Sequence, residues 1–181
     1  MKPIARMGIG ELAAFVSSHL KRNGIEVVLS GGGCVAVYSD DRYVSYDLDF
    51  VENLGSSRRR LKQVLEMIDF AAEGRYFKHP ATDFFLEFPA GPLALGDEPP
   101  QQVVVLQYET GELTALSPTD CVKDRLAAYF HWNDRECLEQ TLLVTAVREV
   151  DLAEVERWAF KEGHAEKFLH YLKMLKSHIE K

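Results

Sequence analysis

The chain has 181 residues, of which 46% are hydrophobic and 27% charged, the composition of an ordinary globular protein of about one domain. A formal net charge of −7 argues against broad nucleic-acid binding, although a local basic groove remains compatible with it. Three scattered cysteines form no C-x-x-C pair, and no apolar run reaches transmembrane length. We therefore expect a cytoplasmic protein that has no zinc knuckle, signal peptide or membrane contact.

The first elements are a helix and a strand. Apolar residues recur at helical spacing between Gly10 and Asn23, and Asn23-Gly24 is a typical C-terminal stop. The continuous apolar run Val27–Leu29 then predicts a buried strand.

Three glycines, Gly31 to Gly33, follow this strand and precede a short helical segment that ends near Tyr38. A glycine-rich turn lets backbone N–H groups approach a phosphate, and a helix N-terminus favours negative charge. This stretch is a candidate phosphate-binding turn.

A second strand, expected between Arg42 and Val51, carries two carboxylates separated by one apolar residue. Side chains on a strand alternate faces, so Asp47 and Asp49 should point the same way while Leu48 points to the other face. Like charges held a few Å apart repel, and a divalent cation such as Mg²⁺ or Mn²⁺ is the usual partner of paired carboxylates.

Two other interpretations fit the same residues. Gly31-Gly32-Gly33-Cys34-Val35-Ala36 matches the loose dinucleotide fingerprint G-x-G-x-x-A, but the helix after it is short and the acids come early. A purely structural glycine turn with two solvated aspartates is the second alternative. Against it, Asp is depleted in strands, and Tyr46, Leu48 and Phe50 indicate a strand here.

The middle of the chain predicts one helix and several strands. Ser56-Ser57 offers an N-cap, and Arg58-Arg59-Arg60 in the first turn is either a solvated basic face or a contact for phosphates or RNA. Short strands are expected at Arg75–Phe77 and Asp83–Phe88, followed by a hairpin whose three-residue loop is Glu109-Thr110-Gly111.

From Ser117 onward the chain is predicted to be helical. Ser117-Pro118 starts one helix, Asn133 with Glu136 caps the next, and Asp151 with Glu154 caps a third. The last helix should span Ala165–Ile179 and pack its apolar stripe on the domain. We expect an α+β (α/β) core over residues 1–116 and a helical C-terminal region over residues 117–181.

The glycine doublet after a strand, followed by Arg42-x-x-Ser45-x-Asp47-Leu48-Asp49, resembles the polymerase-beta-like nucleotidyltransferase superfamily. The pattern is most similar to the small bacterial branch that includes the abortive-infection toxin nucleotidyltransferases. The resemblance is strongest over roughly the first half of the chain and weaker beyond it, and it implies a small mixed β-sheet backed by helices.

The resemblance also implies roles for individual residues. A third carboxylate on the neighbouring strand completes the metal site or acts as general base, and Glu87 matches it by position, with Asp83 as the rival. A basic residue on a later helix reaches nucleotide phosphates and an acid follows that helix, which Arg125 or Lys123 and then Asp134 would supply. An ordinary exposed helix face is the alternative interpretation. The nucleotide-binding candidates are Gly31, Gly32, Arg42, Ser45, Lys123, Arg125 and Asp134.

The implied activity is transfer of a nucleoside monophosphate from a nucleoside triphosphate to an acceptor such as tRNA, a protein or a small molecule. Mg²⁺ or Mn²⁺ would be held by Asp47, Asp49 and Glu87. An antitoxin-like protein is a possible partner. A module that binds nucleotide or a partner without turnover is the alternative, and a nicotinamide-binding oxidoreductase is a third hypothesis.

Overall fold

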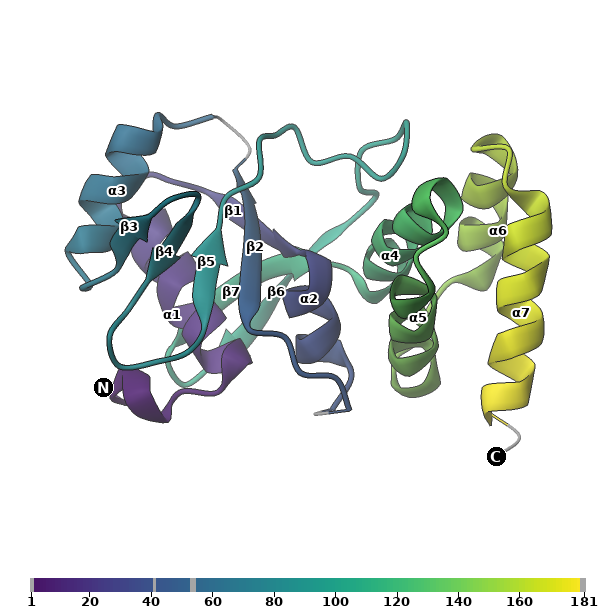
Figure 1. Cartoon of the computed structure of the whole chain (residues 1–181), viewed down its shortest axis with the longest axis horizontal. Helices are drawn as coiled ribbons and strands as arrows, with labels where there is room; N and C mark the ends of the chain where they lie inside the picture. Colours follow the sequence, from purple (N-terminus) through teal and green to yellow (C-terminus); the bar gives the residue numbers. More distant parts are fainter. Residues whose placement is uncertain (1, 41, 53–54, 180–181) are drawn as a thin grey trace.

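The computed structural model describes residues 2–40, 42–52 and 55–179. One mixed sheet holds seven strands in the order β3-β4-β5-β2-β1-β7-β6, and helices pack against it and beside it (Figure 1). The strands are β1 (Val27–Ser30), β2 (Asp47–Glu52), β3 (Ala71–Glu73), β4 (Tyr76–Lys78), β5 (Phe85–Glu87), β6 (Val103–Tyr108) and β7 (Gly111–Leu116). The helices are η1 (Ile4–Arg6), α1 (Ile9–Arg22), α2 (Gly31–Tyr38), α3 (Arg58–Glu66), α4 (Pro118–Trp132), α5 (Arg135–Val147), α6 (Leu152–Lys161) and α7 (Ala165–Ile179). This arrangement confirms the predicted α+β class with a mixed sheet.

The centre of the sheet is made of β1 and β2, which run antiparallel with Leu29 opposite Phe50 and Ser30 opposite Asp49. β5 lies parallel to β2 on its other side, and β7 lies parallel to β1. The chain reaches β5 from β2 through α3 and the β3–β4 hairpin, because parallel neighbours need a crossover. The two central strands therefore carry the glycine turn and the carboxylate pair side by side.

One face of the sheet forms the main core. α1 contributes its predicted apolar stripe, in which Leu12, Val16 and Leu20 are fully buried, and it packs chiefly on β7. α2 packs on the same face of the sheet as α1. It lies close to β1 and β2 there: a Cβ at Gly33 would lie 3.1 Å from the Leu48 side chain and 3.4 Å from that of Leu29. The opposite face of β2, with Asp47 and Asp49, is left for the site.

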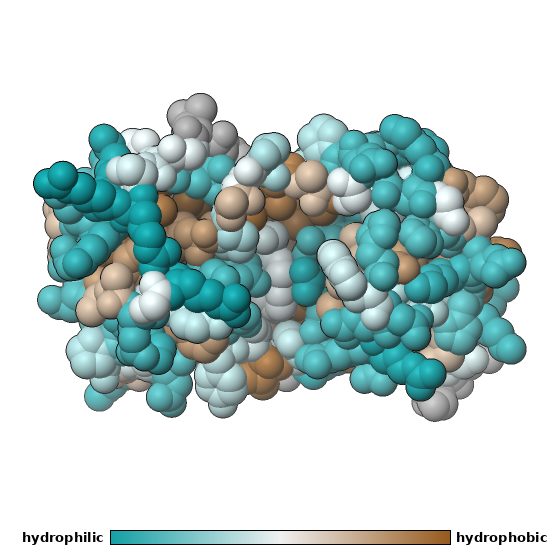
Figure 2. All heavy atoms as spheres, turned by 45° about the horizontal axis from the view of Figure 1, so that its top comes forward, coloured by the Kyte–Doolittle hydropathy of each residue, from teal (hydrophilic) through white to brown (hydrophobic). Residues whose placement is uncertain are grey.

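The helices after the sheet form a second layer beside it, with α7 farthest from the strands (Figure 1). α7 packs against α5 and α6 and buries Phe168, Tyr171 and Leu175. Phe168 and Leu175 belong to the predicted apolar stripe, whereas its Leu169 and Ile179 are exposed. Figure 2 shows separate apolar patches, one of them in the upper middle of this view, among largely hydrophilic side chains. No helix among the described residues is long and apolar enough to cross a membrane.

Several local predictions differ from the structure. The hairpin pairs Tyr108 with Gly111, so its loop has two residues instead of three. Asn133 adopts φ 56° and ends α4, and the N-cap of α5 is Asp134, whose carboxylate accepts from the Cys137 amide at 3.1 Å. Asn133 ends α4 instead of capping α5 because Asn tolerates the left-handed conformation, which closes a helix at its C-terminus. β2 starts at Asp47 and not at Arg42, and β3 was not predicted.

Candidate active site

The carboxylate group of the site is built by β2 and β5. Asp47 and Asp49 lie two residues apart on β2 and share a face, and Glu87 on β5 is the register partner of Asp49. Asp83, the rival carboxylate, precedes β5 and is exposed. The predicted strand alternation and the parallel register together bring three acids to one face of the sheet, on the inner strands β2 and β5.

Negative charge accumulates at Asp49. Burial raises the pKa of its carboxyl to about 7, and the nearby charges of Asp47 and then Glu87 act in the same direction. Ser45 fixes the neighbouring acid, since its hydroxyl donates to Asp47 Oδ1 at 2.5 Å. Glu87 Oε1 lies 3.4 Å from Arg75 Nε in a partly exposed ion pair. The site thus holds more negative charge than its own cations neutralise.

Oxygen ligands of this kind suit a hard divalent cation. Among the described residues, however, no group of three or more acid, His or Cys side chains is arranged to hold a metal ion. Asp47 accepts from the Ser45 hydroxyl, and Glu87 is paired with Arg75. The donor chemistry of Asp47 and Asp49 fits a cation, and Glu87 would join them by turning from Arg75.

The glycine turn meets the carboxylates directly. Gly31 begins α2 with φ +65°, and a Cβ there would lie 2.1 Å from Asp49 Oδ2. A Cβ on Gly32 would lie 3.2 Å from Ser45 Oγ and 3.4 Å from Tyr43 Oη. Only glycine allows the first turn of α2 to approach the acids this closely.

Replacing Gly31 by Ala is expected to disturb both the turn and the acid beside it. The methyl group would collide with Asp49, and φ +65° is strained for any residue with a Cβ, so we expect a loss of about 1–3 kcal/mol in the free energy of unfolding. Chemical denaturation measures this. Gly74→Ala is the control, because Gly74 has φ +61° but a Cβ added there would meet no described atom within 4 Å. An equal loss in both variants would show that φ alone matters.

A cleft of about 310 Å³ lies over Asp49 and Glu87. Gly31, Asp124 and Arg125 line it from the α2 and α4 side, and the connection between β5 and β6 supplies apolar lining. The Arg125 guanidinium is bound to its neighbour, with Nε at 3.0 Å and Nη2 at 2.6 Å from Asp124 Oδ2. The same oxygen accepts from the Gly31 amide at 3.2 Å. The cleft therefore contains acids, one cation and a helix N-terminus.

The other predicted nucleotide contacts lie elsewhere. Arg42 is exposed and does not line the cleft. Asp134 caps α5, and the Cys137 amide lowers its pKa. Lys123, the alternative cation on α4, is only 1% exposed and pairs with Glu154 at 2.5 Å and Asp120 at 3.5 Å. The structure brings Arg125 to the carboxylates and turns Lys123 away, because α4 buries the Lys123 side against α6.

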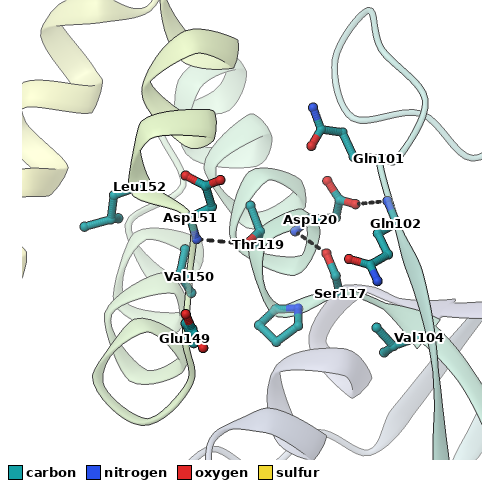
Figure 3. Close-up of a pocket in the computed structure, with 11 residues that line it drawn as sticks. Gln101, Gln102, Val104, Ser117, Thr119, Asp120, Glu149, Val150, Asp151 and Leu152 are labelled. Carbon is teal, nitrogen blue, oxygen red and sulfur yellow. Dashed lines mark hydrogen bonds between the residues drawn. The ribbon is translucent and has the colours of Figure 1, made fainter.

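A larger hollow of about 560 Å³ lies where β7 passes into α4, and none of the predicted site residues lines it (Figure 3). In it, Asp120 Oδ2 accepts from the Gln102 amide at 2.8 Å, and Thr119 Oγ1 accepts from the Asp151 amide at 3.0 Å. These bonds join the N-termini of α4 and α6 to the sheet, and they give the hollow a structural role. We place the chemistry in the smaller cleft, where the carboxylates converge.

Two residues of the site were missed from the sequence. Asp124 touches the first amide of α2, and the Tyr43 hydroxyl donates to Glu136 at 3.3 Å while facing Gly32. Asp124 lies one turn after Asp120 and directly before Arg125, which was a candidate. No local pattern, however, indicates that this face of α4 meets a glycine 93 residues earlier.

No protein-family model and no curated protein sequence matches the chain. Among solved structures, the solution structure of the antibiotic-resistance factor ANT(2'')-Ia superposes with a TM-score of 0.50 at 17% identity, covering 91% of this chain and 97% of that one. A crystal structure of ANT(2'')-Ia in complex with adenylyl-2''-tobramycin gives 0.47 at 14% identity, covering 93% and 97%. At such identity the first likeness shows the fold alone: the chain shares the mixed α+β fold of ANT(2'')-Ia.

Proposed function

We propose that this protein is a metal-dependent nucleotidyltransferase that moves a nucleoside monophosphate from a nucleoside triphosphate to an acceptor. The observation that carries the proposal is the contact between the glycine turn and the acids. Gly31 starts α2 against the Asp49 carboxyl, and Asp47 shares the face of Asp49. A phosphate-binding turn and an oxygen donor pair in one cleft are the two parts that such a reaction needs.

In this proposal Asp47 and Asp49 hold the divalent cation, and Glu87 is the third carboxylate. Mg²⁺ or Mn²⁺, when bound, supplies Lewis-acid polarisation and screens the negative charge of the triphosphate. The chain supplies orientation: the hydroxyl of Ser45 holds Asp47, and the first amides of α2 face the phosphates. Arg125 adds the buried positive charge nearest to the cleft, and Glu87 is positioned to accept a proton from the acceptor.

Three classes of acceptor are candidates for this reaction. The solved ANT(2'')-Ia complex contains adenylyl-2''-tobramycin, which places a small aminoglycoside among the candidates. The resemblance of the Arg42–Asp49 motif to the toxin branch adds tRNA and protein. The chain should be incubated with each α-labelled nucleoside triphosphate and Mg²⁺, with total RNA, total protein or an aminoglycoside as the acceptor.

Label in one acceptor class, dependent on Mg²⁺ or Mn²⁺, is the expected result. Nucleotide binding without label in any class would instead favour a binding module on the same fold. A chain that neither binds nor transfers nucleotide would refute both.

The phosphate-binding turn gives a separate prediction. Replacing Gly32 by Val should weaken nucleotide binding, because the added methyl groups press on Ser45 and Tyr43, which flank the turn. Gly32 is partly exposed and its φ is not in the left-handed region, so we expect only a small loss of stability. Calorimetric titration with Mg²⁺-ATP and a melting scan measure the two effects. Unchanged affinity would move the phosphate site away from this turn.

A further inference from the structure

One carboxylate in the cleft has no part in the proposed chemistry. Asp124 Oδ2 accepts three hydrogen bonds, from the Gly31 amide, Arg125 Nε and Arg125 Nη2, at 3.2, 3.0 and 2.6 Å. A backbone amide at a helix N-terminus together with an Arg fork is the donor set that a phosphate oxygen receives in proteins. In this structure a carboxylate oxygen of the chain itself takes that set.

The α2 helix depends on this contact because it has no cap of its own. Its N-cap residue, Ser30, makes no capping bond, and the Ser30 hydroxyl instead donates to the Asp49 carbonyl at 3.4 Å. The anion at the first amide therefore comes from α4, 93 residues away in sequence. Asp and Asn are favoured at helix N-termini, so Asp124 serves α2 as a cap donated by another helix.

A purely structural role does not explain why an acid stands at position 124, because the cleft is already acidic. Asp124 adds its charge to a cleft already lined by Asp49 and Glu87, with Asp47 beside them on β2, and this charge acts against ionisation of Asp49. Its carboxylate is 18% exposed and faces the space that a triphosphate would enter. A triphosphate and Asp124 cannot use the Gly31 amide and the same edge of the Arg125 guanidinium at once.

We propose that Asp124 competes with the nucleotide for the first amide of α2 and for Arg125, so that a triphosphate binds only when the Asp124 side chain turns away. The inference rests on the proposed function, because it takes the α2 turn as the phosphate site. Asp124 is then a positioning residue that sets nucleotide affinity. The apparent affinity for triphosphate is then the intrinsic affinity multiplied by the fraction of molecules in which the Asp124 side chain is turned away.

The test compares wild type, Asp124→Asn, Asp124→Ser and the control Glu66→Gln, which removes a half-exposed acid from α3. Each is titrated with inorganic triphosphate and Mg²⁺ by calorimetry, and its melting temperature without triphosphate shows that it is folded. We expect the two Asp124 variants to bind about tenfold more tightly, because each loses a competing charge-assisted contact. The control should match wild type. Loss of a cap alone would lower the melting temperature but would not raise affinity.

Equal or weaker binding by both Asp124 variants, with binding by wild type, would overturn the competition and leave the proposed function standing. No binding by any of the four proteins at millimolar triphosphate would overturn both. Tighter binding by the variants without label transfer in any acceptor class would support the competition and refute the enzyme.

Discussion

The proposed function predicts that replacing Asp49 by Asn strongly lowers nucleotidyl transfer and removes the stabilisation that metal and nucleotide would give the wild-type protein. Asp49 is the most perturbed acid of the cleft and contacts the start of α2, so losing its charge removes a ligand and leaves the reacting phosphate unscreened. We expect a loss of about 100- to 1,000-fold in label transfer, the usual scale for one preorganised electrostatic partner.

Melting scans measure the binding part of this prediction. A ligand that binds only the folded state at a hundred times its dissociation constant stabilises it by about 2.7 kcal/mol, or roughly 5–10 °C for a domain of this size. Wild type should show this gain with Mg²⁺ and nucleotide, and Asp49→Asn should not. Asp83→Asn is the matched control, because Asp83 is an exposed acid outside β5. A gain that persists in Asp49→Asn would remove this residue from the site.

In EDTA, where no metal is bound, Asp49→Asn is expected to leave the protein at least as stable as wild type at high pH. The pKa of Asp49 is about 7 in the folded state and near 4 in an unfolded chain, so the folded state binds the proton more tightly. Wild-type stability should therefore fall as the pH rises from about 4 to 7, by on the order of 2–4 kcal/mol, and stay level above that. Asp49→Asn should lose this slope and match or exceed wild type at pH 8. A stability loss at pH 8 would instead indicate a structural hydrogen bond.

Replacing Lys123 by Met is expected to be the most destabilising change outside the site. The ammonium is 2% exposed and lies between Glu154 and Asp120, whose Oδ1 has no hydrogen-bond partner within the described part of the chain. Removing the cation leaves the buried Asp120 carboxylate without a counter-charge and takes one partner from the partly buried Glu154, which keeps Arg157. Breaking a buried pair costs about 3–5 kcal/mol. Urea denaturation measures the loss. Lys21→Met is the control, because Lys21 pairs with Glu112 in an exposed contact and should change stability little.

The loss in Lys123→Met should depend on pH. Hydrogen bonds from Arg157, and then the contact with Lys123, lower the pKa of Glu154 to about 2 in the folded state. A depressed carboxyl pKa contributes stability that is fully present above the unfolded value near 4.5 and is lost as the pH falls through 2. The difference between wild type and variant should thus be largest above pH 5 and shrink toward pH 2. A difference independent of pH would mean that lost packing, and not charge, dominates.

Local patterns in the sequence predicted much of the fold. The apolar stripe of α1, the buried run of β1 and the Asp151 cap of α6 all appear as expected. Each depends on residues within about two turns of one another, where helical and strand periodicity act. The three-residue strand β3 was not predicted, because β3 has only exposed side chains and β4 is the strand that it pairs with.

The two ends of α4 illustrate the limit of local reasoning. Ser117 and Pro118 were correctly expected to start the helix, since an N-cap and a proline act through adjacent backbone groups. After its end, the N-cap of α5 was assigned to Asn133 instead of Asp134, because Asn caps an N-terminus in one conformation and closes a C-terminus in another. Which conformation forms depends on where α5 packs, and the spacing of residues does not contain that information.

By itself the sequence determined that Asp47 and Asp49 share a face, because a strand has a period of two whatever surrounds it. It also predicted the glycines between β1 and the short helix; in the structure they form the first turn of α2, where a side chain at Gly31 would collide with Asp49. The tertiary structure alone decided that Glu87 lies opposite Asp49, that Arg125 and not Lys123 faces the cleft, and that Asp124 reaches Gly31. These contacts join residues from about 30 to more than 90 positions apart, and the packing of α4 against α5, α2 and α6 selects which side of that helix is buried.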